Sequence, residues 1–168
     1  MSLRTALSAI GLAAIALLPS AAHAQARTTH ATQLWLSAGA GFGLTGRTNG
    51  LPFDFGGATT LGLTVQHRVL VGSVRWARTG ASPAANWFAG GMLGVGSAPA
   101  APIRGSIAAG LGVAGGPDRG NDLTVPMEVQ IGLRLTPVIG LGLTGFAAVE
   151  GHHQNVGATF GFQLGRLW

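Results

Sequence analysis

Apolar and polar side chains alternate along eight segments of the chain, and residues typical of turns separate these segments. The clearest segment is residues 125–136, where every odd position from Val125 to Leu135 is apolar and the even positions include Glu128 and Arg134. A period of two places successive side chains on opposite faces of a β-strand. The other segments are residues 34–45, 60–66, 70–76, 87–95, 103–113, 139–150 and 156–168. The pattern therefore predicts eight two-sided strands and no lasting helical periodicity.

The connections between these segments predict how the strands are joined. Polar, Gly-, Asp- and Asn-containing connections follow the odd strands, at residues 46–57, 78–85, 115–124 and 151–155. Mostly tighter ones follow the even strands, at residues 67–68, 97–102 and 136–137. Long connections at one end and short turns at the other are typical of an up-and-down barrel. We therefore expect an all-β fold, a closed eight-stranded antiparallel transmembrane β-barrel over residues 33–168, with its first and last strands paired.

Composition indicates which face of these strands meets lipid. Charged residues make up 9% of the chain, against roughly 25% in soluble domains, while apolar residues make up 47% and there are 29 glycines. The polar face of the strands consists mainly of Gly, Ser and Thr, which would make a poor water-facing surface. The same pattern suits a barrel whose apolar face meets lipid and whose small and polar side chains fill a narrow lumen.

The amino terminus has the layout of a secretory signal peptide. Arg4 precedes an apolar run over residues 6–18, and the small-residue site 22–24 ends just before Gln25. The run is too short for a membrane-spanning helix, which needs roughly 20 residues. We predict a signal peptide at 1–24 and a short periplasmic segment at 25–32, and hence export to the periplasm and the outer membrane of a Gram-negative-type bacterium.

Several charged residues fall on the inward face of the predicted barrel. They form a predicted lumen polar cluster of Arg75, Arg104, Glu128, Gln130 and Arg134. A buried charge without a partner is strongly unfavourable, so Glu128 needs a cation. Arg134 lies roughly 20 Å away along the same strand, and Arg104 falls near the same end as Arg134. We therefore predict a cross-lumen pair between Arg75 and Glu128.

The sequence predicts no cofactor site and no nucleic-acid partner. The chain has no cysteine, which excludes disulfides and thiolate metal sites. The glycines at 110, 112 and 115 have a dinucleotide-type spacing, but no helix can begin before Pro117. The ten arginines are scattered singly, without the basic stripe that nucleic-acid binding requires.

Glu150, His152 and His153 are the remaining candidates for chemistry. As a metal site they are disfavoured, because neighbouring side chains on an extended segment point to opposite faces. A lipid hydrolase would need a serine beside a histidine, and Ser73 and Ser106 lie far from the histidines on the predicted strands. We therefore predict neither a metal site nor a catalytic site, and Glu150 and His153 are the residues to test if the protein is a hydrolase.

Aromatic residues mark the two rims and the carboxy terminus. Trp76 and Trp87 flank the second long connection and Trp168 falls at the opposite rim, as expected of membrane-interface aromatics. The last segment, FGFQLGRLW, places apolar residues at alternate positions, namely Phe160, Phe162, Leu164 and Trp168, and only Arg166 breaks this alternation. Together with the signal peptide and the eight segments, this end resembles small outer-membrane barrels of the OmpA/OmpX transmembrane type. The resemblance implies that these four residues form a C-terminal insertion signal, read by the barrel-insertion machinery.

Three functions are compatible with this pattern. We favour a structural or surface-interaction barrel without catalysis, surrounded by outer-membrane lipids, whose outward loops would contact any extracellular ligand or surface partner. A narrow channel for small solutes is the alternative, because glycines on the inward face leave free space. A lipid-hydrolysing barrel is a weaker alternative.

Overall fold

The computed structural model describes residues 32–47, 53–80, 85–99, 101–117, 119–151 and 153–167. The predicted signal peptide, most of the predicted periplasmic segment and Trp168 lie outside these residues. Within the described ranges, no helix is long and apolar enough to cross a bilayer.

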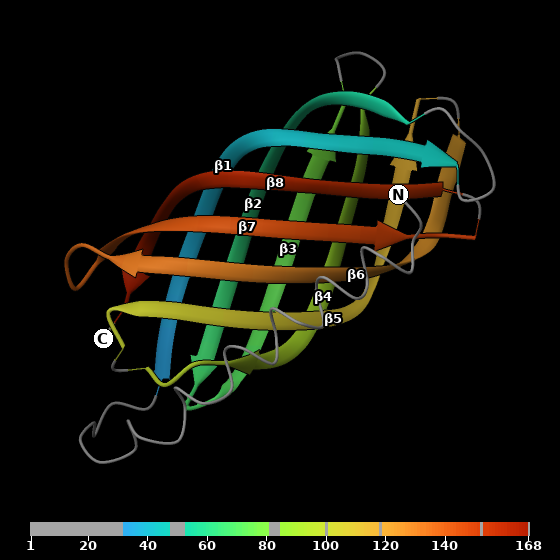
Figure 1. Ribbon diagram of the computed structural model, residues 1–168. Helices are drawn as coiled ribbons and strands as arrows, with labels where there is room; N and C mark the ends of the chain where they lie inside the picture. The colour runs from blue at the N-terminus through green and yellow to red at the C-terminus, as the bar shows by residue number, and fades with distance from the viewer. Residues whose placement is uncertain are drawn as a thin grey trace.

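The described residues form a single closed barrel of eight antiparallel strands, each hydrogen-bonded to its neighbours in chain order (Figure 1). The strands are β1 (Thr32–Arg47), β2 (Asp54–His67), β3 (Leu70–Thr79), β4 (Asn86–Gly96), β5 (Ile103–Gly116), β6 (Arg119–Arg134), β7 (Ile139–Val149) and β8 (His153–Arg166). The predicted fold class is confirmed. We call the end where β1 begins and β8 ends the proximal end, and the opposite end the distal end.

Pairing between β1 and β8 closes the barrel. Leu36 lies opposite Leu63 of β2 on one side and Leu164 of β8 on the other. The ladder between β1 and β8 runs from Leu34 opposite Arg166 to Arg47 opposite His153. The predicted pairing of the first and last strands is therefore confirmed, and neither of these strands is left with an open edge.

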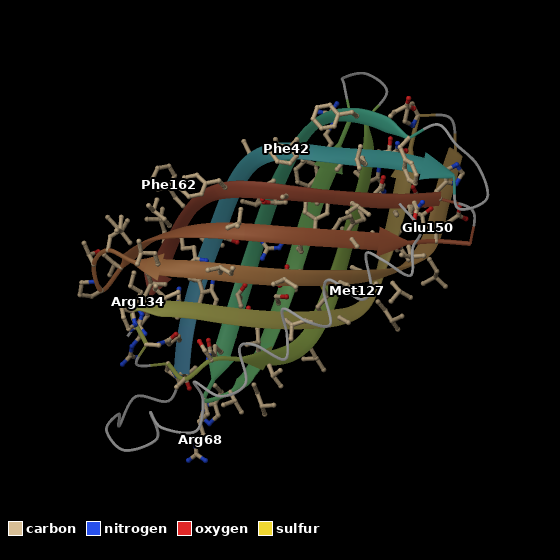
Figure 2. The ribbon with its side chains drawn as sticks, viewed as in Figure 1. Phe42, Arg68, Met127, Arg134, Glu150 and Phe162 are labelled. Atoms are coloured by element: carbon tan, nitrogen blue, oxygen red, sulfur yellow. The ribbon has the colours of Figure 1, made fainter. Side chains whose placement is uncertain are left out.

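The two faces of the barrel wall have opposite chemistry. Large apolar side chains point outward and are exposed, including Leu36, Leu93 and Phe162, which are 55%, 79% and 62% exposed. Figure 2 shows Phe42 and Phe162 projecting away from the barrel wall. Their neighbours along the strands point inward and are buried, as Ser37 is beside Leu36. The barrel is thus apolar outside, the reverse of a water-soluble protein.

The predicted alternation of long and short connections is wrong. β5 continues to Gly116 and β6 begins at Arg119, and these two residues face each other across the sheet, so most of the predicted loop 115–124 is a hairpin. β7 and β8 are likewise separated only by residues 150–152. Polar residues such as Asp122 still pair through their backbone, here with Ala114. These residues are polar because they lie beyond the apolar belt of the barrel, and their polarity does not mean that they form an irregular loop.

Glycine permits close contact between neighbouring strands. A Cβ atom on Gly110 of β5 would lie 1.9 Å from the carbonyl oxygen of Gly91, and one on Gly161 of β8 would lie 1.9 Å from that of Ala38. The glycines with dinucleotide-type spacing, at 110, 112 and 115, all lie within β5, with no helix after them in the described chain. They shape the wall, as glycines in strands commonly do.

Candidate functional site: the barrel lumen

The middle of the lumen is occupied by an ion pair between two strands that are not neighbours. Arg75 of β3 donates from Nε to Oε2 of Glu128 on β6, at 2.8 Å. Both side chains are almost completely buried. The predicted cross-lumen pair is present. Burial of this kind is tolerated because the two charges compensate each other.

Neutral donors complete the environment of the Glu128 carboxylate. Ser73 Oγ and Gln130 Nε2 each donate to Oε1 of Glu128 at 2.8 Å. Arg75 Nη1 in turn donates to Ser37 Oγ on β1 at 2.7 Å. Side chains of β1, β3 and β6 are thereby joined by hydrogen bonds across the barrel interior.

A second polar layer lies toward the proximal end, around Arg104 of β5. Its Nη1 donates to Gln33 Oε1 at 3.0 Å and its Nη2 to Gln163 Oε1 at 2.7 Å. The guanidinium carbon lies 4.4 Å from the centroid of the Trp35 ring, within cation–π range. Arg104 is thus held by neutral acceptors and an aromatic face, and the described residues place no carboxylate within salt-bridge distance of it.

The connection between β4 and β5 covers the proximal mouth. The carbonyl oxygen of Pro99 accepts from Gln33 Nε2, at 3.0 Å, and from Arg134 Nη2. The carbonyl of Ser97 accepts from Gln66 Nε2 at 2.7 Å. Arg134 therefore lies in the lumen as predicted from its inward parity, and it anchors the connection that closes this end.

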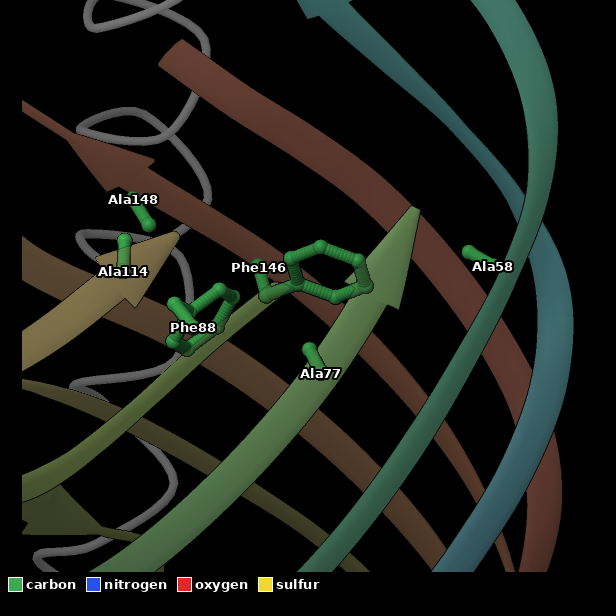
Figure 3. Packing of buried hydrophobic residues seen from close by; sticks show 6 residues of the cluster. All are labelled: Ala58, Ala77, Phe88, Ala114, Phe146 and Ala148. Atoms are coloured by element: carbon green, nitrogen blue, oxygen red, sulfur yellow. The ribbon is translucent and has the colours of Figure 1, made fainter. Parts of the chain in front are cut away.

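An apolar cluster closes the distal half of the lumen. Phe88 of β4 and Phe146 of β7 lie with ring centroids 5.6 Å apart and are 1% and 3% exposed. Figure 3 shows the two rings pointing toward each other across the interior, surrounded by alanines of several strands. The alanines of this cluster are Ala58, Ala77, Ala114 and Ala148. The sequence predicts small and polar side chains in the lumen, and in this half two aromatic rings occupy the inward face beside them.

Two small, separate cavities lie in the described part of the lumen. They measure about 10 Å³ each and lie beside the polar layers, one between Ser37 and Thr144 and one between Trp35 and Gln130. Each has room for about one water molecule. No continuous passage is formed by these two cavities.

The candidates for chemistry at the distal end are not arranged as a catalytic site. Ser73 donates to Glu128 and not to a histidine. The backbone N–H of Glu150 donates to the carbonyl of His153 at 2.9 Å, which closes the turn between β7 and β8. Both residues have further interactions with their surroundings. Over the described ranges, no group of three His, Asp or Glu residues is placed to hold a metal ion. His152 lies outside those ranges.

The rim and carboxy-terminal residues all face outward where the structure describes them. Trp76 is 40% exposed on β3, and Trp87 is half-buried at the start of β4, both near the distal end. Phe160, Phe162 and Leu164 are exposed on β8. Trp168 lies outside the described residues.

The predicted lumen polar cluster leaves out four residues that lie buried in the lumen, namely Gln33, Trp35, Phe88 and Gln163. All four are at most 3% exposed. The sequence pattern indicates the inward position of three of them, because Trp35, Gln33 and Gln163 alternate with apolar residues in the same way as the small polar residues of β1 and β8. Phe88 lies in a Gly- and Ala-rich strand whose alternation is too weak to assign its face.

Similar proteins were found by structure and not by sequence. The barrel is similar to Neisserial surface protein A (NspA), with a TM-score of 0.65 and 13% identity over 78% of this chain and 96% of that chain. It is also similar to Ail, the attachment invasion locus protein of Yersinia pestis, with a TM-score of 0.60 and 9% identity over 80% of this chain and 99% of that one. The N-terminal β-barrel domain of Pseudomonas aeruginosa OprF matches with a TM-score of 0.53 and 8% identity, over 80% of this chain and 98% of that chain. No protein-family model and no curated protein matches the sequence. At these identities the likeness concerns the fold, and at that level the resemblance to small eight-stranded outer-membrane barrels is confirmed.

Proposed function

We propose that the protein is a small outer-membrane β-barrel with a structural or surface-interaction role and no catalytic activity, in a Gram-negative-type bacterium. The observation that carries this proposal is the closed wall with an apolar outer face. In hydrocarbon each unpaired backbone group would cost several kcal/mol, and a closed ladder avoids that cost. The same apolar belt in water would be one large exposed hydrophobic patch.

The filled lumen supports a structural role over transport. The Phe88–Phe146 contact, the Arg75–Glu128 pair and the Arg104 layer follow one another along the interior. A solute would have to displace all three layers. The described lumen therefore gives no support to the channel alternative.

Any partner specificity would reside at the distal end. The first strand begins and the last strand ends at the proximal end. In outer-membrane barrels both chain termini lie in the periplasm, so the distal end would face the cell exterior. Ail of Yersinia pestis, a barrel of similar fold, has been solved in complex with the heparin analogue sucrose octasulfate. For the present chain, the surface available to a partner there would be formed by the distal hairpins and the connections between them.

The proposal includes residues 1–24 as a signal peptide and the four apolar residues Phe160, Phe162, Leu164 and Trp168 as the insertion signal read by the barrel-insertion machinery. Trp76, Trp87 and Trp168 would lie at the membrane interfaces, where indole rings are favoured.

Fractionation of cells that express the full chain tests the proposal. We expect the protein in the outer-membrane fraction, with a gel mobility that changes when the sample is heated, because a closed barrel resists unfolding in detergent. Deletion of Trp168 should reduce the amount inserted, with Arg78→Gln at the distal end as the control variant. Recovery of a folded protein in the soluble periplasmic fraction would contradict the proposal.

A further inference from the structure

The charges of the barrel are distributed unequally between its two ends. The proximal end carries Arg68, Arg104, Arg134 and Arg166, and no acidic residue among those the structure describes. Acidic and basic residues balance at the distal end, where the described ones are Asp54, Asp122 and Glu150 with Arg47, Arg78 and Arg119. Counted over the described residues alone, the formal charge is therefore 4 − 0 = +4 at the proximal end and 3 − 3 = 0 at the distal end.

Two of the four proximal arginines are directed out of the molecule. Arg104 and Arg134 are bound inside the lumen, whereas Arg68 and Arg166 are exposed. Arg166 lies at the end of β8, opposite Leu34 and two residues beyond the exposed Leu164, and so at the proximal edge of the apolar belt. Arg68 lies in the turn between β2 and β3, and Figure 2 shows its side chain extending away from the barrel wall. Neither guanidinium has a hydrogen-bond or ion-pair partner among the described residues.

Arg68 occupies a backbone conformation that disfavours an arginine. Its φ is 55°, the one positive value found at a non-glycine residue in the described chain. It is the first of the two residues between β2 and β3, and a positive φ at that place in a hairpin turn strongly favours glycine. Its carbonyl accepts from Gln66 Nε2 at 2.7 Å, so the turn itself is braced through the backbone and not through the guanidinium. The arginine side chain thus has no structural task within the described barrel that would offset its backbone cost.

We propose that Arg68 and Arg166 form a proximal rim that binds the phosphodiester headgroups of anionic phospholipids in the leaflet facing this end. This inference rests on the proposed membrane insertion. A guanidinium at the edge of an apolar belt reaches the headgroups while its methylenes stay against apolar surface, and it forms charge-assisted hydrogen bonds with phosphate. Arg104 and Arg134 add to the positive potential behind the rim.

The size of the effect follows from the charge of the rim. An arginine near an anionic membrane surface contributes roughly 1 kcal/mol, which is about a 5-fold change in an equilibrium constant. Two arginines should therefore favour the folded, inserted state by about 25-fold more in anionic than in neutral vesicles. The gain should decrease as salt is added, because screening weakens exposed charges.

Refolding into two kinds of vesicle tests this proposal. The vesicles contain phosphatidylcholine alone or equal parts of phosphatidylcholine and phosphatidylglycerol, and urea titration gives the ratio of folded to unfolded protein. The unmodified barrel should gain about 25-fold in this ratio from phosphatidylglycerol, and the double variant Arg68→Gln/Arg166→Gln should lose most of that gain. The matched control is Arg78→Gln at the electrically balanced distal end, which should keep the gain. An equal loss in the control would place the lipid preference elsewhere and overturn the proposal.

A second variant separates charge from backbone conformation. Arg68→Gly relieves the positive φ, so it should raise stability in phosphatidylcholine while reducing the gain from phosphatidylglycerol. A purely structural role for Arg68 predicts a loss of stability in both vesicles instead, and that result would overturn the proposal.

The outcomes also separate this inference from the proposed function. A barrel that inserts into both vesicles with equal stability refutes the lipid preference alone, whereas one that inserts into neither refutes membrane residence as well. A gain in stability from soluble polyglutamate, with none from phosphatidylglycerol, would indicate an acidic soluble partner and overturn the assignment to lipid.

Discussion

At the scale of single residues, the strongest constraint on the lumen is the Arg75–Glu128 pair. Replacement of either residue by Gln leaves the other charge buried without a counter-charge, which should cost about 3 to 5 kcal/mol of the free energy of unfolding. The double variant Arg75→Gln/Glu128→Gln should cost less than the sum of the two, because it strands no charge. Urea unfolding in detergent micelles measures all three, with Arg78→Gln at the distal end as a near-neutral control. Losses that simply add would show that the two residues are not coupled.

The same scale shows what inward parity can and cannot predict. Arg75 and Glu128 were predictable as partners because charge demands a counter-charge, and position along the strands left few candidates. The partners of Gln33 and Gln163 were not predictable. A neutral amide on the inward face does not require a charged partner, and its neighbour depends on the stagger between strands. In the structure both amides accept hydrogen bonds from Arg104, which lies on β5 and not on a strand next to β1 or β8.

At the scale of strands, glycine on the inward face sets how closely neighbouring strands approach. Gly110→Ala would place a Cβ atom 1.9 Å from the carbonyl oxygen of Gly91, so β4 and β5 would have to separate. We expect a loss of at least about 1 to 3 kcal/mol, the usual cost of overpacking. Gly91→Ala on the adjacent strand is the matched control, since its Cβ would meet nothing within 4 Å. Urea unfolding of the two variants checks this, and equal stabilities would contradict the proposed role of Gly110.

Strand existence was predictable, whereas strand length was not. Alternation over residues 125–136 places β6 correctly, because a side chain that meets lipid must be apolar whichever loop follows. Beyond the belt that requirement ends, and Asp122 can pair through its backbone with Ala114 while its side chain stays polar. The Gly-, Asp- and Asn-rich residues therefore begin where the apolar belt ends, and the hairpin from β5 to β6 continues past that boundary.

At the scale of the whole molecule, the three layers of the lumen predict that the barrel does not conduct. We expect no steady single-channel conductance from the purified protein in planar bilayers. The double variant Phe88→Ala/Phe146→Ala should also give no steady conductance. The Arg75–Glu128 pair and the Arg104 layer would still lie between the two mouths of the barrel after the rings are removed. Loss of Phe88, Phe146, Arg75 and Glu128 together should leave only the proximal layer and give brief, irregular openings. A steady conductance from the unmodified barrel would instead require a continuous water path through side chains that are here in contact, and it would favour the channel over the structural role.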